Sequence, residues 1–239
     1  MLVKKICLIN GLLLSANLLM AETNFFWSLD AGLLISSSQT DSGIISGHLI
    51  LNNGTSYKAD QEGLLGYGGI FSLHSGVGVN NIFIETGIDF CLGNRNETVI
   101  TLLDHNIENA KFQRYYAYSS LDIPILVSMP LKLSDKFTIR PAAGLYISIP
   151  LGNMEYHQEA KVFTDPTFTE SYNITSVILC GFESDVKFIC AIEKINGGVF
   201  FKCNFKYDLN PLHGVTDDYV PFTTSRQALS FSIGYEGVF

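Results

Sequence analysis

Apolar side chains alternate with small or polar ones along almost the whole chain, at a period of two residues. The last segment, 228–239, is the clearest example, because Leu229, Phe231, Ile233 and Tyr235 fall on odd positions. Ala, Ser, Gly and Glu occupy the even positions up to 236. Successive side chains of a β-strand point to opposite faces, so this pattern predicts a strand with one apolar face.

Seven further segments carry the same alternation, and they predict an all-β chain of eight antiparallel strands. They are 25–36, 67–73, 82–92, 121–131, 137–149, 178–192 and 199–209. Long connections are expected over 37–65, 93–116, 150–176 and 210–226, with tight turns near Asn80-Asn81, Ser134-Asp135 and Asn196-Gly197. Long loops at one end and short turns at the other are typical of up-and-down outer-membrane barrels.

The short turns also predict strand registers. A turn centred on Asn80-Asn81 pairs Phe71 with Phe90, both on apolar faces. Asn-Gly is a strong signal for a two-residue type I′ turn, and a turn centred on Asn196-Gly197 pairs Phe188 with Phe205. In both hairpins the apolar faces coincide, which a slip of one residue would destroy.

Residues 1–21 form a separate element. Lys4 and Lys5 precede a mostly apolar stretch, and Ala21 stands before the first acidic residue, Glu22. This arrangement predicts a secretory signal peptide over 1–21 and a mature barrel domain over 22–239. The apolar stretch is shorter than the ~20 residues that a membrane-spanning helix needs. Removal of the segment leaves 13 basic and 23 acidic residues, which does not favour a nucleic-acid partner.

The polar faces of the predicted strands collect charged residues as well as Gly, Ala and Ser. The charged members, which we expect to form an ion-pair network in the lumen, are Asp30, Glu85, Asp89, Asp122, Arg140, Glu183, Asp185, Lys187, Lys202, Lys206 and Glu236. A soluble barrel or sandwich would place them in water. However, small residues are suited to filling the interior of a narrow eight-stranded barrel, and only 16% of the chain is charged. The pattern therefore favours a membrane barrel.

A membrane barrel must close, because lipid cannot hydrogen-bond a free strand edge. The C-terminal strand is accordingly expected to pair with 25–36. Buried charges persist when they are paired, so Arg140 is expected to bond an acidic neighbour such as Asp122, Glu85 or Asp89.

Three stretches resemble a known family. They are SSLDIPILVSMPL, FTIRPAAGLYISIPLG and the terminal GYEGVF. They are similar to the outer-membrane β-barrels that include the PorT-like and OmpA/OmpX-like eight-stranded proteins. The resemblance implies location in the cell outer membrane, contact with its lipid, and assembly by periplasmic chaperones and the barrel-assembly machinery. It also implies an assembly signal at Ser232, Gly234, Tyr235 and Phe239, with Gly237 standing where the family usually has a large apolar residue.

Few residues suggest chemistry. The predicted register opposes Cys190 and Cys203 on the apolar face, where a disulfide or two unbonded thiols are both possible. No spacing of Cys and His indicates a metal, and no cofactor motif is present. His74 lies beside Ser72 and Ser75, which allows comparison with lipid-A-deacylating barrels, but its place near a short turn disfavours that chemistry.

We therefore predict a non-enzymatic outer-membrane barrel that presents its loops for a structural, adhesive or ligand-binding role. The alternatives are a small pore or transporter and, third, a lipid-modifying membrane enzyme. The extracellular ligand, if one exists, is expected to meet the four long loops.

Overall fold

The computed structural model describes residues 23–41, 44–45, 48–50, 56–79, 81–102, 111–160, 168–173, 178–192, 196–210, 212–215 and 221–238. The predicted signal segment 1–21 and Phe239 lie outside these ranges. Within them, no helix has the length and apolarity needed to cross a bilayer.

Eight long strands form the wall of one closed barrel. They are β1 (Thr23–Asp41), β4 (Ser56–Val79), β5 (Ile82–Leu102), β6 (Lys111–Ser128), β8 (Phe137–Ala160), β10 (Leu179–Ile192), β11 (Gly197–Asp208) and β13 (Pro221–Val238). Short strands flank them: β2 (Ile44–Ile45), β3 (His48–Ile50), β7 (Leu131–Lys132), β9 (Phe168–Asn173) and β12 (Leu212–Val215).

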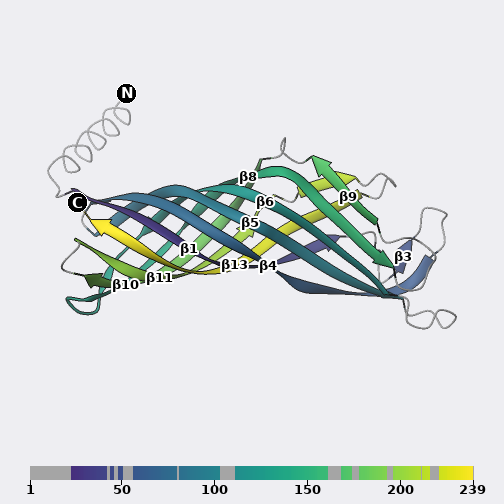
Figure 1. Cartoon of the computed structure of the whole chain (residues 1–239), viewed down its shortest axis with the longest axis horizontal. Coiled ribbons are helices and arrows are strands. Elements are labelled where there is room, and N and C mark those ends of the chain that lie inside the picture. The colour runs from purple at the N-terminus through teal and green to yellow at the C-terminus, as the bar shows by residue number, and fades with distance from the viewer. Residues whose placement is uncertain are drawn as a thin grey trace, which may run out of the picture.

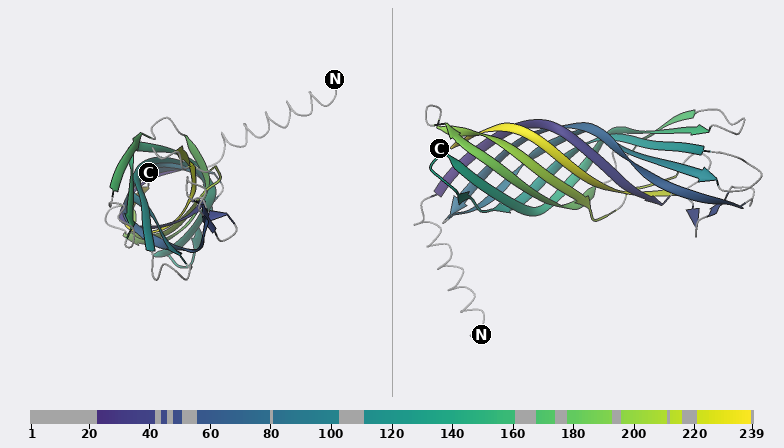
Figure 2. Two further views of the ribbon diagram at one scale, coloured as in Figure 1. Left: turned by 90° about the vertical axis from the view of Figure 1, so that its right-hand side faces the viewer. Right: turned by 90° about the horizontal axis from the view of Figure 1, so that it is seen from below.

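Each long strand pairs antiparallel with its sequence neighbours, and the first strand closes the ring. The order is β1-β13-β11-β10-β8-β6-β5-β4, with β4 pairing back to β1. This confirms the predicted eight-stranded up-and-down barrel and the pairing of the C-terminal strand with residues 25–36. The ring is visible end-on in Figure 2, and both described ends of the chain lie at the short-turn end in Figure 1.

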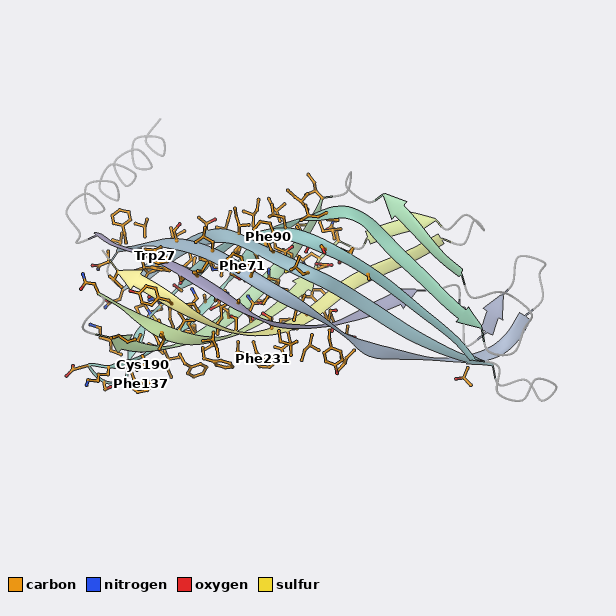
Figure 3. The ribbon with its side chains drawn as sticks, viewed as in Figure 1. Trp27, Phe71, Phe90, Phe137, Cys190 and Phe231 are labelled. Atoms are coloured by element: carbon orange, nitrogen blue, oxygen red, sulfur yellow. The ribbon has the colours of Figure 1, made fainter. Side chains whose placement is uncertain are left out.

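Side chains alternate across the wall with apolar residues outward and charged residues inward. Leu145, Ile147 and Ile233 are 59%, 46% and 71% exposed, whereas Asp89 and Lys187 are completely buried. Figure 3 shows Trp27, Phe71 and Phe90 on the outer face of the wall. A soluble barrel would have the opposite arrangement, so the exposed apolar face is that of a transmembrane barrel.

Aromatic side chains mark the two limits of this exposed face. Phe25, Trp27 and Phe137 are exposed near the short turns, and Tyr67 and Tyr207 are exposed at the other limit. We call the exposed apolar side chains between these two limits the apolar belt. Tyr67 pairs with Ile35 of β1, ten residues from Phe25. At roughly 3.3 Å per residue and a tilt of about 40°, this spacing gives a belt about 25 Å high, the usual height in outer-membrane barrels.

Four neighbouring strands, β4, β5, β6 and β8, continue well beyond the apolar belt, and Figure 1 shows them projecting from the barrel. β4 starts at Ser56 and β5 ends at Leu102, inside the predicted loops 37–65 and 93–116. Much of 150–176 and 210–226 is likewise strand, in β8, β9, β12 and β13. The four loops were therefore predicted to be too long. A strand outside the membrane does not require apolar residues on one face, so its sequence lacks the alternating pattern by which strands were recognised.

Glycines occupy irregular points where two strands leave the apolar belt. The β5–β6 register shifts between Cys91 and Asn94, where Gly93 has φ +68°. The β6–β8 register shifts between Ala117 and Ser119, close to Gly152 with φ +72°. A positive φ is easily adopted by glycine, and a bulge of this kind bends a strand.

One predicted register is confirmed and one is wrong. Phe71 pairs with Phe90, as the turn at Asn80-Asn81 predicts. In the β10–β11 hairpin, however, Phe188 pairs with Phe201 and not with Phe205. Gly197 pairs with Ile192, so four residues separate the paired positions, and Asn196 has φ +49° as the last of them. The Asn-Gly pair therefore ends a longer turn and is not its centre.

The corrected register separates the two cysteines. Cys190 lies opposite Val199, and Cys203 lies opposite Val186. Both thiols are free and keep the predicted outward-facing side, because the shift in pairing is even. The predicted direct opposition of Cys190 and Cys203 is wrong, and no disulfide joins them.

Candidate functional site in the barrel lumen

The eleven charged residues that the sequence places in the lumen are all buried inside the barrel. They come from seven of the eight long strands, because inward positions alternate along every strand. Most of their ion pairs connect strands that are not neighbours in the ring. The interior is therefore a set of charged contacts that cross the barrel.

Arg140 and Glu236 form the contact nearest the short turns. The Arg140 guanidinium donates from Nη1 and Nη2 to the two carboxylate oxygens of Glu236, at 2.7 and 2.5 Å. The rings of Phe26 and Phe83 lie 4.5 and 5.2 Å from the guanidinium carbon. Glu85 is 3.9 Å from Arg140 and is a weaker partner. The predicted partners Asp122 and Asp89 were wrong, since the tilt of the strands brings β13 to Arg140.

Two further lysines bind single carboxylates across the lumen. Lys187 of β10 donates to Glu85 of β5 at 2.8 Å, and Ser128 also donates to this carboxylate. Lys202 of β11 donates to Asp30 of β1 at 2.8 Å. These bonds link walls that no backbone ladder joins.

Lys206 of β11 contacts three carboxylates. Its ammonium donates to Asp89 at 2.7 Å and to Asp122 at 2.8 Å, and it lies 3.5 Å from Glu183. Asn204 donates to Glu183 at 2.5 Å, which provides that carboxylate with a second contact. Four strands thus meet at one buried ammonium.

Arg226, Asp208 and Tyr146 were not among the residues predicted for the lumen network. Arg226 is buried in β13, where a loop was predicted, and it binds Asp122 at 3.1 Å and Asp208 at 3.4 Å. Tyr146 donates to Asp208. Only the continuation of β13 beyond the predicted strand start could have indicated Arg226 as a lumen residue.

His74 is buried as well. Its Nε2 lies 2.8 Å from Asp89, in the β4–β5 pair. The side chain of Ser28 opposes it on β1 and is completely buried. This histidine belongs to the ion-pair network of the interior.

Asp185 is the exception among the lumen carboxylates. It is 2% exposed, and neither carboxylate oxygen has a hydrogen-bond partner among the residues that the structure describes. The nearby lysines, Lys187 and Lys202, donate to Glu85 and Asp30 instead. An unpaired buried charge is destabilising by several kcal/mol, so the ionised form of Asp185 is costly.

Aromatic rings fill the remaining space, and glycines make room for them. A Cβ at Gly76 or Gly78 would meet the ring of Phe26 or Phe83, and a Cβ at Gly181 would meet the ring of Tyr146. This explains why the inward face is rich in glycine, as predicted for the packing of a narrow interior.

The lumen is thus occupied by rings and by charged contacts that cross it. Among the described residues, no group of three or more His, Cys, Asp or Glu side chains is placed to hold a metal ion. An apolar exterior of membrane height around a charged, packed interior defines the eight-stranded outer-membrane β-barrel class.

No protein-family model matches the chain, and no curated protein matches it either. Several solved outer-membrane proteins are similar to it. Neisserial surface protein A is 11% identical, over 88% of this chain and 95% of its own, with a TM-score of 0.36. OprG of Pseudomonas aeruginosa is 7% identical, over 90% and 96%, with a TM-score of 0.42. The attachment invasion locus protein Ail of Yersinia pestis is 9% identical, over 89% and 98%, with a TM-score of 0.33.

Proposed function

We propose that this chain is a non-enzymatic outer-membrane barrel, in which a rigid and plugged base carries a surface-exposed β structure. The main support is the contrast between the two halves of the molecule. Inside the apolar belt, charged pairs such as Arg140–Glu236 and Lys206–Asp89 cross the lumen. Beyond the belt, β4, β5, β6 and β8 continue as a projecting wall. Rigid scaffolds with variable projecting segments are suited to adhesion or ligand binding.

Outer-membrane lipid is the proposed partner of the apolar belt, and an extracellular ligand is the proposed partner of 37–65, 93–116, 150–176 and 210–226. The barrel-assembly machinery is the proposed partner of the terminal strand. In that strand Tyr235 packs against Trp27, with ring centroids 5.5 Å apart. Export through a signal peptide at 1–21 belongs to the same proposal.

Protease treatment of intact cells tests the orientation and the exposed structure together. We expect cleavage within the four segments beyond the belt and a protected fragment containing the belt strands. Cleavage only after the outer membrane is permeabilised would refute the proposal. The same cells, before and after treatment, can then be compared for adhesion to host-cell surfaces.

A small pore is the second candidate, favoured by the polar lining of the lumen, where the described part of the chain buries eight carboxylates and five Lys and Arg side chains. Planar-bilayer recording of the purified protein separates the two functions. The scaffold function predicts no sustained single-channel current, because the charged contacts and rings occupy the lumen. A stable current that disappears with a blocking substitution inside the lumen would favour the pore.

A further inference from the structure

A cavity of about 350 Å³ lies at the short-turn end of the barrel, opposite to the projecting strands. Side chains and backbone from β5, β7, β8, β10, β11 and β13 line it. Its volume falls in the range of about 300–1,000 Å³ that is usual for small-molecule sites. The proposed surface function does not use this end of the molecule.

Most of the wall of the cavity is apolar. Phe83, Pro130, Ile189 and Ile192 contribute hydrophobic surface, and Ala191 leaves space between them. An alkyl group of a few carbon atoms would be removed from water there. Each buried CH₂ would contribute about 0.8 kcal/mol to the free energy of binding.

Two cationic side chains, Arg140 and Lys132, also line the cavity. The Arg140 side chain is 7% exposed, and both of its Nη atoms donate to Glu236. Its Nε is buried from solvent and has no hydrogen-bond partner among the described residues. Lys132 of β7 is exposed and also lines the cavity. Glu236 balances one of the two cations, so the described side chains of the wall carry one net positive charge.

We propose that this cavity binds a small organic carboxylate with an apolar body. The carboxylate meets the exposed ammonium of Lys132 and is attracted by the Arg140 guanidinium, which lines the same cavity. The body packs on Phe83, Ile189 and Ile192. The net positive charge of the wall disfavours amines of the same shape and favours a carboxylate over a neutral amide. A fatty acid and the C-terminus of a peptide share this chemistry.

The first test is a titration of the full mature protein in lipid nanodiscs, followed through the methyl NMR signals of Ile189 and Ile192. Hexanoate is expected to produce saturable shifts, with a dissociation constant at least tenfold lower than that of hexanamide. Hexylamine is expected to produce no shifts. N-acetylleucine distinguishes the two sources of the carboxylate. If it binds more tightly than hexanoate, the ligand is a peptide C-terminus. If it binds more weakly, the ligand is a straight-chain fatty acid. Equal shifts with hexanoate and hexanamide would overturn the proposal.

Variants provide the second test. Ala191→Phe fills the cavity and should abolish the hexanoate shifts, whereas Ala31→Phe, on the outer face of β1, should leave them unchanged. Lys132→Gln removes an exposed charge and should weaken binding roughly two- to fivefold. If Ala191→Phe does not fold, the comparison of Lys132→Gln with the wild type decides. Unchanged hexanoate affinity in both Ala191→Phe and Lys132→Gln would contradict the assignment.

Discussion

Lys206 and Asp89 meet at 2.7 Å, although they stand on β11 and β5, which are four strands apart in the ring of eight. The same ammonium donates to Asp122 of β6 at 2.8 Å. No backbone hydrogen bond can join opposite walls of a barrel. The buried ammonium therefore links opposite sides of the barrel directly, whereas the backbone hydrogen bonds connect them only through the intervening strands.

We expect Lys206→Met to lower the free energy of unfolding by about 3–5 kcal/mol, because it leaves buried carboxylates without their cation. Urea unfolding from lipid vesicles can be followed through Trp27, the single tryptophan of the chain. Lys136→Met is the matched control, since Lys136 is exposed in the turn before β8. The control should change stability by less than about 0.5 kcal/mol. Equal effects of the two substitutions would show that Lys206 does not act as a central contact.

Asp185 and Asp89 should respond in opposite ways to replacement by Asn. Among the residues that the structure describes, Asp185 has no hydrogen-bond partner, so Asp185→Asn removes a cost and should leave stability unchanged or raise it by about 1 kcal/mol. Asp89 accepts from Lys206 and contacts His74, so Asp89→Asn should cost about 2 kcal/mol. The same urea titration measures both variants. A loss of stability in Asp185→Asn as large as that in Asp89→Asn would indicate a partner for Asp185 that the described residues do not include.

The fold was predictable from the sequence because lipid imposes a strict period of two on every strand inside the apolar belt. Ile147 and Ile233 could be placed outside, and Asp89 and Lys187 inside, from alternation alone. The partners inside the lumen were not predictable, because which residues face each other depends on strand tilt and on the stagger around the ring. Arg140 therefore meets Glu236, which sequence reasoning did not select.

The residues at which the strands begin and end were also not predictable from the sequence. Beyond the belt both faces of a strand can be polar, so β5 continues through Asn94–Arg95–Asn96–Glu97 without an apolar face. Arg226 was assigned to a loop for the same reason. The turn at Asn196 shows a different limit, since a favourable Asn-Gly pair fixes a local conformation but not the length of the turn around it.

Gly237 provides a test of packing at the aromatic limit of the belt. It pairs with Trp27, and a Cβ at this position would lie 2.5 Å from the indole Nε1. Gly237→Ala should therefore displace the indole from its contact with Tyr235, shift the emission of Trp27, and cost about 1–2 kcal/mol. Gly69→Ala is the control, because its Cβ would meet only one atom, at 3.9 Å. An unchanged Trp27 spectrum in Gly237→Ala would contradict the described packing.

The corrected β10–β11 register predicts which cysteines can be joined. Cys190 lies opposite Val199, so Val199→Cys should form a disulfide with Cys190 on oxidation, as directly opposed positions have suitable Cα separations. The wild-type pair, Cys190 and Cys203, should stay free under the same conditions. Mobility on non-reducing gels, with and without a reductant, reports the bond. A Cys190–Cys203 bond in the wild type would require the register centred on Asn196-Gly197.

The central claim is that the apolar side chains face lipid and the charged network faces the lumen. Quenching of tryptophan fluorescence by lipids with brominated acyl chains tests it most directly. In a Trp27→Phe background, Leu145→Trp places the reporter on a residue that is 59% exposed, and Phe200→Trp places it on one that is 2% exposed. We predict strong quenching of Leu145→Trp and little quenching of Phe200→Trp. Equal quenching of the two, or stronger quenching of Phe200→Trp, would contradict the membrane barrel.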